Sequence, residues 1–193
     1  MQKTASRLLF ASLLAGLGFA APASAAPAPN EFYVTIQGQK QGKLRGESTR
    51  KGQEGKMIGL AYDYGVKSPR DVATGQASGK RQHSPITFSK EWGASTPQLF
   101  QALVSNEVLT TVLFEFVRIN PKTGIEEIFQ TVKLTNAQLS GISHHTGPAP
   151  LPETKRAAND MLELEDISIV FQKIEIENKT AGTVASDSTF GEP

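Results

Sequence analysis

The stretch "SGKRQHSPITFSKEWGASTPQLFQAL", numbered 78 to 103, decides the fold. Its apolar residues alternate at Ile86 and Phe88, which predicts a half-buried strand, because successive side chains of a strand point to opposite faces. A basic cluster of Lys80, Arg81 and His83 comes just before this strand. Since no wider basic surface surrounds the cluster in the sequence, we interpret it as a rim that pairs with acidic groups of a neighbour.

A helix follows the strand in the same stretch. Ser95 or Thr96 can cap it, and Pro97 fits its first turn, where a missing backbone N–H costs nothing. The apolar residues then recur at helical spacing and form a stripe, which consists of Leu99, Phe100 and Leu103. The helix should end near residues 105 and 106.

On either side of this stretch, the chain reads as strands. Alternation predicts one strand over residues 32–36 and another over "MIGLAYDYGV", residues 57–66, where Asp63 lies on the face opposite Tyr62 and Tyr64. Residues 112–119 are apolar on both faces, so this strand should be covered on both, by the helix or by another subunit. Many short strands and a single helix predict a mainly β fold, an antiparallel sandwich or small barrel.

The last strands lie within "LELEDISIVFQKIEIE", which ends at Glu177. The apolar positions change parity between Leu164 and Ile167, and again between Phe171 and Ile174. Such changes indicate bulges or a bend.

Polar segments separate the strands. Residues 38–56 hold five glycines and many charges, which predicts a long exposed loop of the kind that is often functional. Residues 67–82 predict a second polar loop, and residues 146–160 a third. The tail, residues 178–193, is small and polar, so we expect it to be disordered.

The first 25 residues predict a secretory signal peptide, followed by a linker over residues 26–30. Lys3 and Arg7 precede an apolar run of 12 residues, and Ala23-Ser24-Ala25 fits the small-residue cleavage pattern. The run is shorter than the roughly 20 residues that span a bilayer, so we expect no membrane span. The sequence therefore predicts an exported protein, secreted or periplasmic.

Composition excludes several classes of function. Removal of 25 from 193 residues leaves 168, enough for one domain with a sizeable core, and loss of Lys3 and Arg7 takes the formal charge from +1 to −1. This balance argues against a nucleic-acid-binding module. Without cysteine the chain forms no disulfide, and with three histidines it has few ligands for a usual zinc site.

The residues that could carry chemistry are better explained without it. His144 and His145 are adjacent, so on a strand they point to opposite faces and do not converge on a metal. The acidic side chains Glu126, Glu127, Glu163, Glu165 and Asp166 suit the polar face of strands, although two of them could imitate glycosidase carboxylates. We predict no enzyme, no cofactor and no metal site.

The order of these segments resembles the haemolysin-coregulated protein family, the tube subunits of bacterial type VI secretion systems. Four stretches carry the likeness: "IQGQKQGKLRGES", "LAYDYGV", "SGKRQHSPITFSKEWGASTPQLFQAL" and "LEDISIVFQKIEI". It extends over roughly residues 31–177. The resemblance implies a small antiparallel β-barrel of two sheets flanked by one α-helix.

The resemblance also implies a function and its residues. Six copies would form a ring around a channel, stacked rings would form a tube, and the channel would carry effector proteins. Asp63 would face the channel. The loop over residues 38–56 would contact neighbouring rings through Lys43, Arg45, Glu47, Arg50 and Lys51.

The predicted signal peptide supports an alternative. Tube subunits of this family generally lack one, because the tube assembles in the cytoplasm. The alternative is an exported binding module, periplasmic or secreted, that keeps the barrel and does not assemble into a tube.

Overall fold

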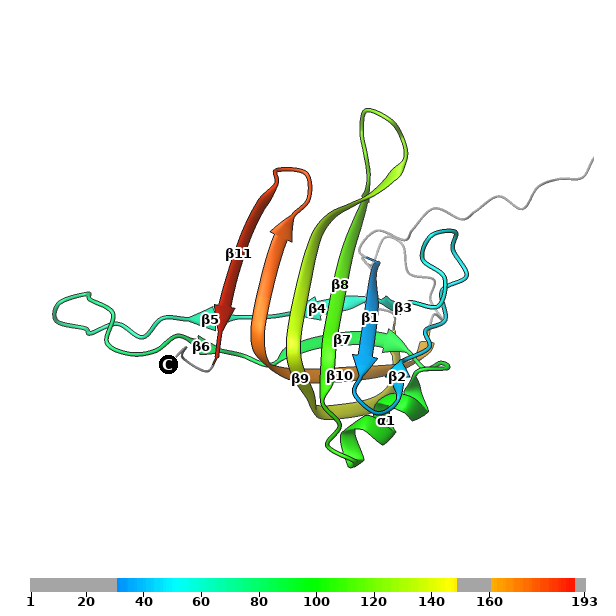
Figure 1. Ribbon diagram of the computed structural model, residues 1–193, viewed down its shortest axis with the longest axis horizontal. Helices are drawn as coiled ribbons and strands as arrows, with labels where there is room; N and C mark the ends of the chain where they lie inside the picture. Colours follow the sequence, from blue (N-terminus) through cyan, green and yellow to red (C-terminus); the bar gives the residue numbers. More distant parts are fainter. Residues whose placement is uncertain (1–30, 149–160, 190–193) are drawn as a thin grey trace, which may run out of the picture.

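A computed structural model describes residues 31–148 and 161–189 of the chain (Figure 1). The predicted class is confirmed, because the described residues form an antiparallel β structure with a single helix. The predicted signal peptide and linker lie outside the described residues, as does most of the predicted loop over residues 146–160.

The first half of the chain forms short strands. They are β1 (Phe32–Gly38), β2 (Gly42–Lys43), β3 (Met57–Gly59), β4 (Ala61–Asp63), β5 (Val66–Lys67), β6 (Gln82–His83) and β7 (Ile86–Glu91). The second half begins with α1 (Thr96–Val104) and continues as three long strands and a short one. These are β8 (Leu109–Ile119), β9 (Glu126–Pro148), β10 (Met161–Asn178) and β11 (Thr183–Ser188).

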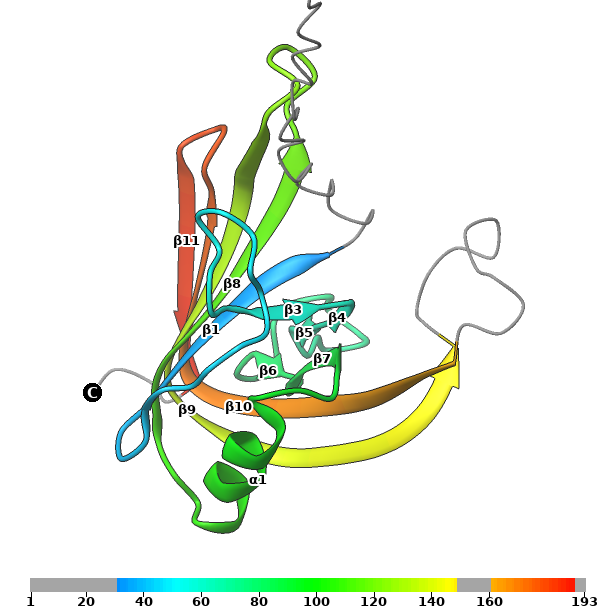
Figure 2. The same ribbon diagram turned by 90° about the vertical axis from the view of Figure 1, so that its right-hand side faces the viewer.

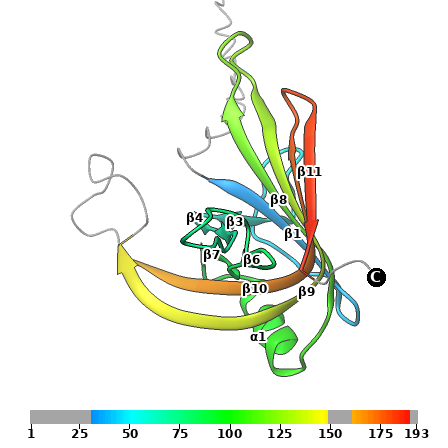
Figure 3. The same ribbon diagram turned by 90° about the vertical axis from the view of Figure 1, so that its left-hand side faces the viewer.

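One nine-stranded sheet makes up the body, in the order β2-β1-β8-β9-β10-β7-β4, with β3 beside β1 and β11 beside β10. The two layers predicted as separate sheets are thus halves of one curved sheet. Strands β9 and β10 run through both halves and bend sharply between them (Figures 2 and 3). A bend is present as predicted, but the register of β10 with β9 shifts between Ser168 and Ile169, which lies between the two predicted positions and at neither of them.

The chain itself completes the barrel. Strand β3 pairs with β1 on one side, and β4 pairs with β7 on the other. Only Leu60 separates β3 from β4, and its backbone N–H donates to Ser89 O at 2.8 Å. The expected single strand over residues 57–66 is therefore divided into β3, β4 and β5, because the chain crosses here from one half of the sheet to the other.

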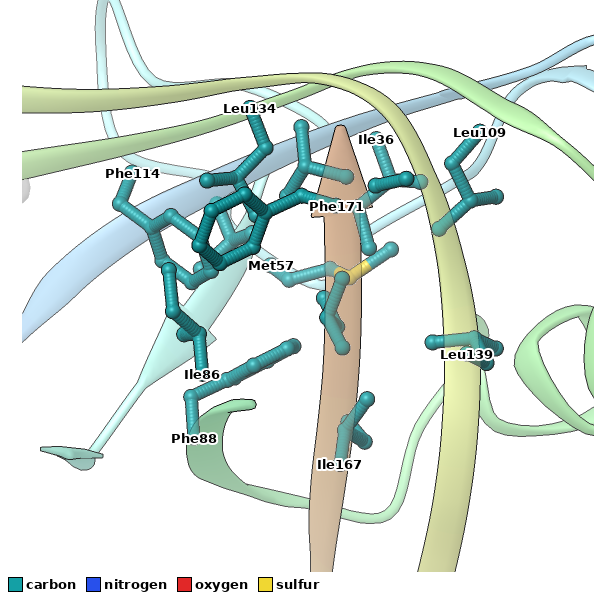
Figure 4. Packing of buried hydrophobic residues seen from close by; sticks show 14 of the residues in the cluster. Ile36, Met57, Ile86, Phe88, Leu109, Phe114, Leu134, Leu139, Ile167 and Phe171 are labelled. Carbon is teal, nitrogen blue, oxygen red and sulfur yellow. The ribbon is translucent and has the colours of Figure 1, made fainter. Parts of the chain in front are cut away.

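The core lies between the two halves of the sheet. Side chains of β1, β8 and β9 meet those of β7 and β10, with Met57 and Phe171 packed among them (Figure 4). Gly59 is required at the crossing, since a Cβ there would lie 2.2 Å from the Phe32 ring. Phe114 and Phe88 contact each other edge to face, with ring centroids 5.5 Å apart.

The helix has its predicted bounds, but its buried face differs from the predicted apolar stripe. Leu99 and Ala102 are buried and Leu103 packs against the core, whereas Phe100 is 54% exposed. The stripe is narrower than expected because the strand that the helix mainly contacts is β9 alone. Asn106 follows with a φ of 50°, the left-handed conformation that commonly ends a helix.

The predicted disorder after residue 178 is wrong for the part of the tail that is described. Lys179 to Gly182 form a turn, and β11 then pairs with β10 from Thr183 to Ser188. The tail is polar because an edge strand with one solvent-facing side can be polar, so low hydrophobicity did not imply disorder here.

Among the described residues no helix is long and apolar enough to cross a membrane.

Candidate assembly surfaces

The loop that leads from β2 to β3 lies on the outer face of its own sheet. Its two sides form a short ladder, in which Gly46 N donates to Gly55 O and Ser48 N donates to Lys56 O, both at 3.0 Å. Leu44 and Ser48 are buried. The long exposed loop predicted for residues 38–56 is therefore a folded flap, which we call the 44–56 flap.

Charged side chains fasten the flap to β1, β8 and β9. Arg50 Nη1 donates to Glu126 Oε2 at 2.9 Å, and its guanidinium lies over the Tyr33 ring, 5.9 Å from the centroid. Lys56 pairs with Glu115 of β8. Tyr33 is buried under this cover, and burial raises the pKa of its hydroxyl.

Glu47 holds the flap against the start of α1. Its Oε1 accepts hydrogen bonds from Ser95 N at 3.3 Å and Ser95 Oγ at 3.0 Å. A carboxylate suits this position, since the first N–H groups of a helix lack partners and carry partial positive charge. Ser95 occupies the N-cap position, one of the two predicted, but its side chain makes no cap bond and instead donates to Glu47 of the flap.

A buried ion pair lies directly beneath. Lys90 Nζ donates to Glu165 Oε1 at 2.9 Å and lies 3.4 Å from Glu47 Oε1. Lys90 is 1% exposed and Glu165 is fully buried. Thr96 Oγ1 also donates to Glu165 Oε1, at 2.9 Å. The cluster joins the flap, β7, β10 and α1 at one point, so its members depend on one another.

The sequence held a signal for this pair that the prediction missed. Lys90 continues the parity of Ile86 and Phe88, and Glu165 continues that of Ile167 and Ile169. Alternation therefore placed both charges on the core side, where a charge needs a partner.

Three of the five predicted ring-contact residues face outward. Lys43, Arg45 and Lys51 are exposed. Glu47 and Arg50 make the contacts within the chain that are described above.

Asp63 is exposed on β4, opposite Tyr62 and Tyr64, which pack against the core. The predicted alternation at this point is confirmed. The Tyr62 hydroxyl is buried without a hydrogen-bond partner in the described part of the chain, and burial strongly raises its pKa.

The histidines lie in two different environments. His144 Nε2 lies 3.1 Å from Glu165 Oε2, and its ring meets the Trp92 ring edge to face. The side chain of His83, a member of the predicted rim cluster, is only 6% exposed and contacts Tyr64 and Asp187. Arg81, predicted to pair with a neighbour, pairs with Asp187 of its own chain. In residues 31–148 and 161–189, no group of three or more acidic or histidine side chains is placed to hold a metal ion.

Several large apolar side chains are exposed, among them residues of α1, of the β8–β9 turn and of the loop between β5 and β6. Phe100 and Val104 lie one turn apart on α1 and are 54% and 55% exposed. Ile119 and Ile125 flank the β8–β9 turn, and Val72 lies in the loop between β5 and β6.

Comparison with known families gives a match over most of the chain. Residues 33–177 match the family model described as "Type VI secretion system effector, Hcp". The matched range begins in β1 and ends in β10, so it contains the helix and all strands except β11.

Individual relatives agree with this match. The chain is 28% identical over 164 residues to the "Major exported protein" of Pseudomonas aeruginosa, an alignment that covers 80% of this chain and 92% of that protein. Among solved structures, a crystal structure of an Hcp protein matches with a TM-score of 0.72 and 28% identity, over 83% of this chain and 99% of the other. The secreted protein Hcp3 from P. aeruginosa matches with a TM-score of 0.63 and 25% identity, over 81% and 98%.

Proposed function

Because the chain belongs to the Hcp family of the type VI secretion system, we propose that it is a structural subunit that forms hexameric rings around a channel. The observation that carries the proposal is the extent of the likeness, which takes in the barrel, the flap and the helix together. We place the activity in surfaces that bind proteins, and we assign no catalytic role to any residue.

Ring closure requires two different surfaces on each subunit. A heterologous contact repeats head to tail, and it closes into a ring when the rotation between neighbours allows. Apolar side chains exposed on α1 and at the β8–β9 turn offer such unlike surfaces on one chain. They support the proposal because each copy can present one surface to its neighbour and receive the other.

The proposal assigns roles to the charged residues. Asp63 faces the channel, where a polar side chain suits the passage of effector proteins. Lys43, Arg45 and Lys51 contact the next ring in a stack, while Glu47 and Arg50 shape the flap that carries them. A cationic group of this kind fits an acidic partner surface and makes stacking sensitive to salt.

We also propose that the chain is exported. The signal pattern that ends at Ala23-Ser24-Ala25 supports cleavage after residue 25. The relatives named as an exported and a secreted protein support secretion.

Imaging of the mature chain, residues 26–193, tests the ring. Negative-stain electron microscopy should show six-fold rings, and light scattering should give the mass of six copies. Monomeric particles at high protein concentration would contradict the proposal. A triple Lys43→Ala, Arg45→Ala, Lys51→Ala variant should keep the rings and lose their stacking, and a Lys133→Ala variant, which removes an exposed lysine of β9, serves as its control.

The alternative function is an exported binding module that does not assemble. The signal pattern is the observation that favours it, because export before assembly would separate the subunit from a cytoplasmic machine. N-terminal sequencing of the protein from each cell fraction distinguishes the two. A processed periplasmic monomer supports the module, and assembled protein in the medium supports the tube.

A further inference from the structure

Residues 66–83 form an arm that leaves the body of the protein. Strands β5 and β6 pair only with each other in the described sheets, and the segment between them extends away from the barrel (Figure 1). The tip is ordered by Asp71, whose Oδ1 accepts from Ala73 N and Thr74 N. The arm is therefore a formed hairpin, and its direction depends on the contacts at its base.

The base of the arm has few backbone contacts with the body. Ser84 N donates to Gly65 O at 2.8 Å, which closes the hairpin and does not anchor it. Tyr64 OH lies 2.7 Å from His83 Nδ1, and the His83 ring meets Phe171 of β10 edge to face, with centroids 5.6 Å apart.

A pocket lies beside the base of the arm. It has a volume of about 600 Å³, and His83, Phe171 and Thr189 are among its lining residues. On this side the base is held by the ring contacts of His83 and by polar contacts.

Asp187 of β11 supplies those contacts. Its carboxylate accepts from Arg81 Nε at 2.5 Å and from Arg81 Nη2 at 2.7 Å, and its Oδ2 lies 3.2 Å from His83 Nε2. The two parallel bonds from Arg81 fix the orientation of the guanidinium as well as its distance. The pairing partner of Asp187 in β10 is Ile174, so the carboxylate stands on a strand that belongs to the main sheet.

We propose that Asp187 is a positioning residue that latches the arm to the C-terminal strand. The C-terminal latch consists of Arg81, His83 and Asp187. It joins segments that lie more than 100 residues apart, so the arm keeps one direction only while β11 is in place. The coupling is reciprocal: a change on the arm also loosens β11. The latch acts within one chain and does not rest on ring formation.

Proteolysis at lysine tests the latch. Lys67 and Lys80 lie on the arm, and both are exposed. An Asp187→Asn variant should be cut there by a lysine-specific protease about fivefold to tenfold faster than the unchanged protein, because cleavage follows the population of the open state. Both proteins are compared as the same oligomer, selected by size exclusion. A Ser186→Ala variant, altered at the exposed neighbour on β11, should be cut at the unchanged rate.

Two further variants keep the test decisive if Asp187→Asn folds poorly. Arg81→Gln leaves the sequence of β11 unchanged and should raise cleavage at Lys67 and Lys80 equally. It should also speed hydrogen exchange in residues 183–189, as reciprocity requires. A double variant, Arg81→Asp with Asp187→Arg, should restore slow cleavage, because it reverses the charges and keeps the pair.

Two results would overturn the latch. One is unchanged cleavage of the arm in both single variants. The other is cleavage that rises as much at Lys133, within β9, as at Lys67, since that would indicate general unfolding.

Discussion

The 44–56 flap and the arm over residues 66–83 look alike in the sequence and behave differently in the structure. Both are polar segments with glycines and basic residues between short strands. The flap lies on its own sheet, held along its length by Glu47, Arg50 and Lys56. The arm projects from the body and is held at its base by Asp187. A polar segment therefore covers its own fold when its charges meet partners from several strands.

The largest effect should come from Lys90, on which the anchor of the flap depends. Lys90→Ala leaves Glu165 buried without its cation, so we expect a loss of about 3–5 kcal/mol in the free energy of unfolding. Urea denaturation measures it. Lys133→Ala removes an exposed lysine from β9 and should change stability by less than about 0.5 kcal/mol. A loss for Lys90→Ala as small as for this control would show that buried Glu165 does not depend on the charge of Lys90.

Glycines in the two segments should respond differently to the same substitution. A Cβ at Gly46 of the flap would lie 2.0 Å from the backbone of Lys56, whereas one at Gly79 of the arm would meet only Pro69, at 3.8 Å. Gly46→Ala should cost about 1–3 kcal/mol, because the backbone has to move. Gly79→Ala should be neutral within about 0.5 kcal/mol. Thermal unfolding measures the stability of the two variants. Equal losses of stability would contradict the expected difference between the flap and the arm.

Neutralising Glu47 should have a smaller effect than removing Lys90. Glu47→Gln keeps an acceptor for Ser95 and loses the charge, and the site is partly exposed. We expect a loss of about 1 kcal/mol, measured by urea denaturation. Glu163→Gln, at an exposed carboxylate of β10, is the matched control. If both variants have the stability of the unchanged protein, the flap does not depend on this charge.

The smallest effect should be the response of the arm to acid. Hydrogen bonds from Arg81 hold the pKa of Asp187 below its ordinary value of 3.8, although partial burial opposes them. Because the folded-state pKa is lowered, the contribution of the latch is complete above pH 3.8 and is lost as the pH falls through the folded pKa. The charged and titratable groups that face Asp187 are Arg81, His83 and Tyr64.

Carbon chemical shifts of the Asp187 carboxyl group, followed by NMR from pH 6 to pH 2, measure this titration. The midpoint should lie below 3.8 in the unchanged protein and rise toward 3.8 in Arg81→Gln. Equal midpoints would show that Arg81 does not stabilise the carboxylate.

Local patterns predicted the regular elements well, because each depends on its own residues. Alternation located β7, and the Ser-Thr-Pro signal located α1. The changes of parity in β10 predicted its bend. The contacts between distant segments could not be predicted in this way. Glu47 reaches a helix 48 residues later, and Arg81 reaches a strand 106 residues later. Such pairs depend on how the sheet curves, which no short window of sequence contains.

For the candidate surfaces too, local patterns could be predicted and long-range contacts could not. The outward position of Asp63 followed from alternation and is found in the structure. The order of the flap and of β11 depends on long-range pairing, so a reading based on polarity predicted exposure for one and disorder for the other.

The crossing at Leu60 has a consequence for the size of the barrel. One residue, Leu60, connects β3 to β4, and its backbone N–H donates a hydrogen bond to Ser89 O at this point. The length of this covalent link therefore limits the circumference of the barrel. The hydrogen-bonded strand pairs do not by themselves set it. An insertion of one or two residues beside Leu60 would let the barrel widen between β3 and β4.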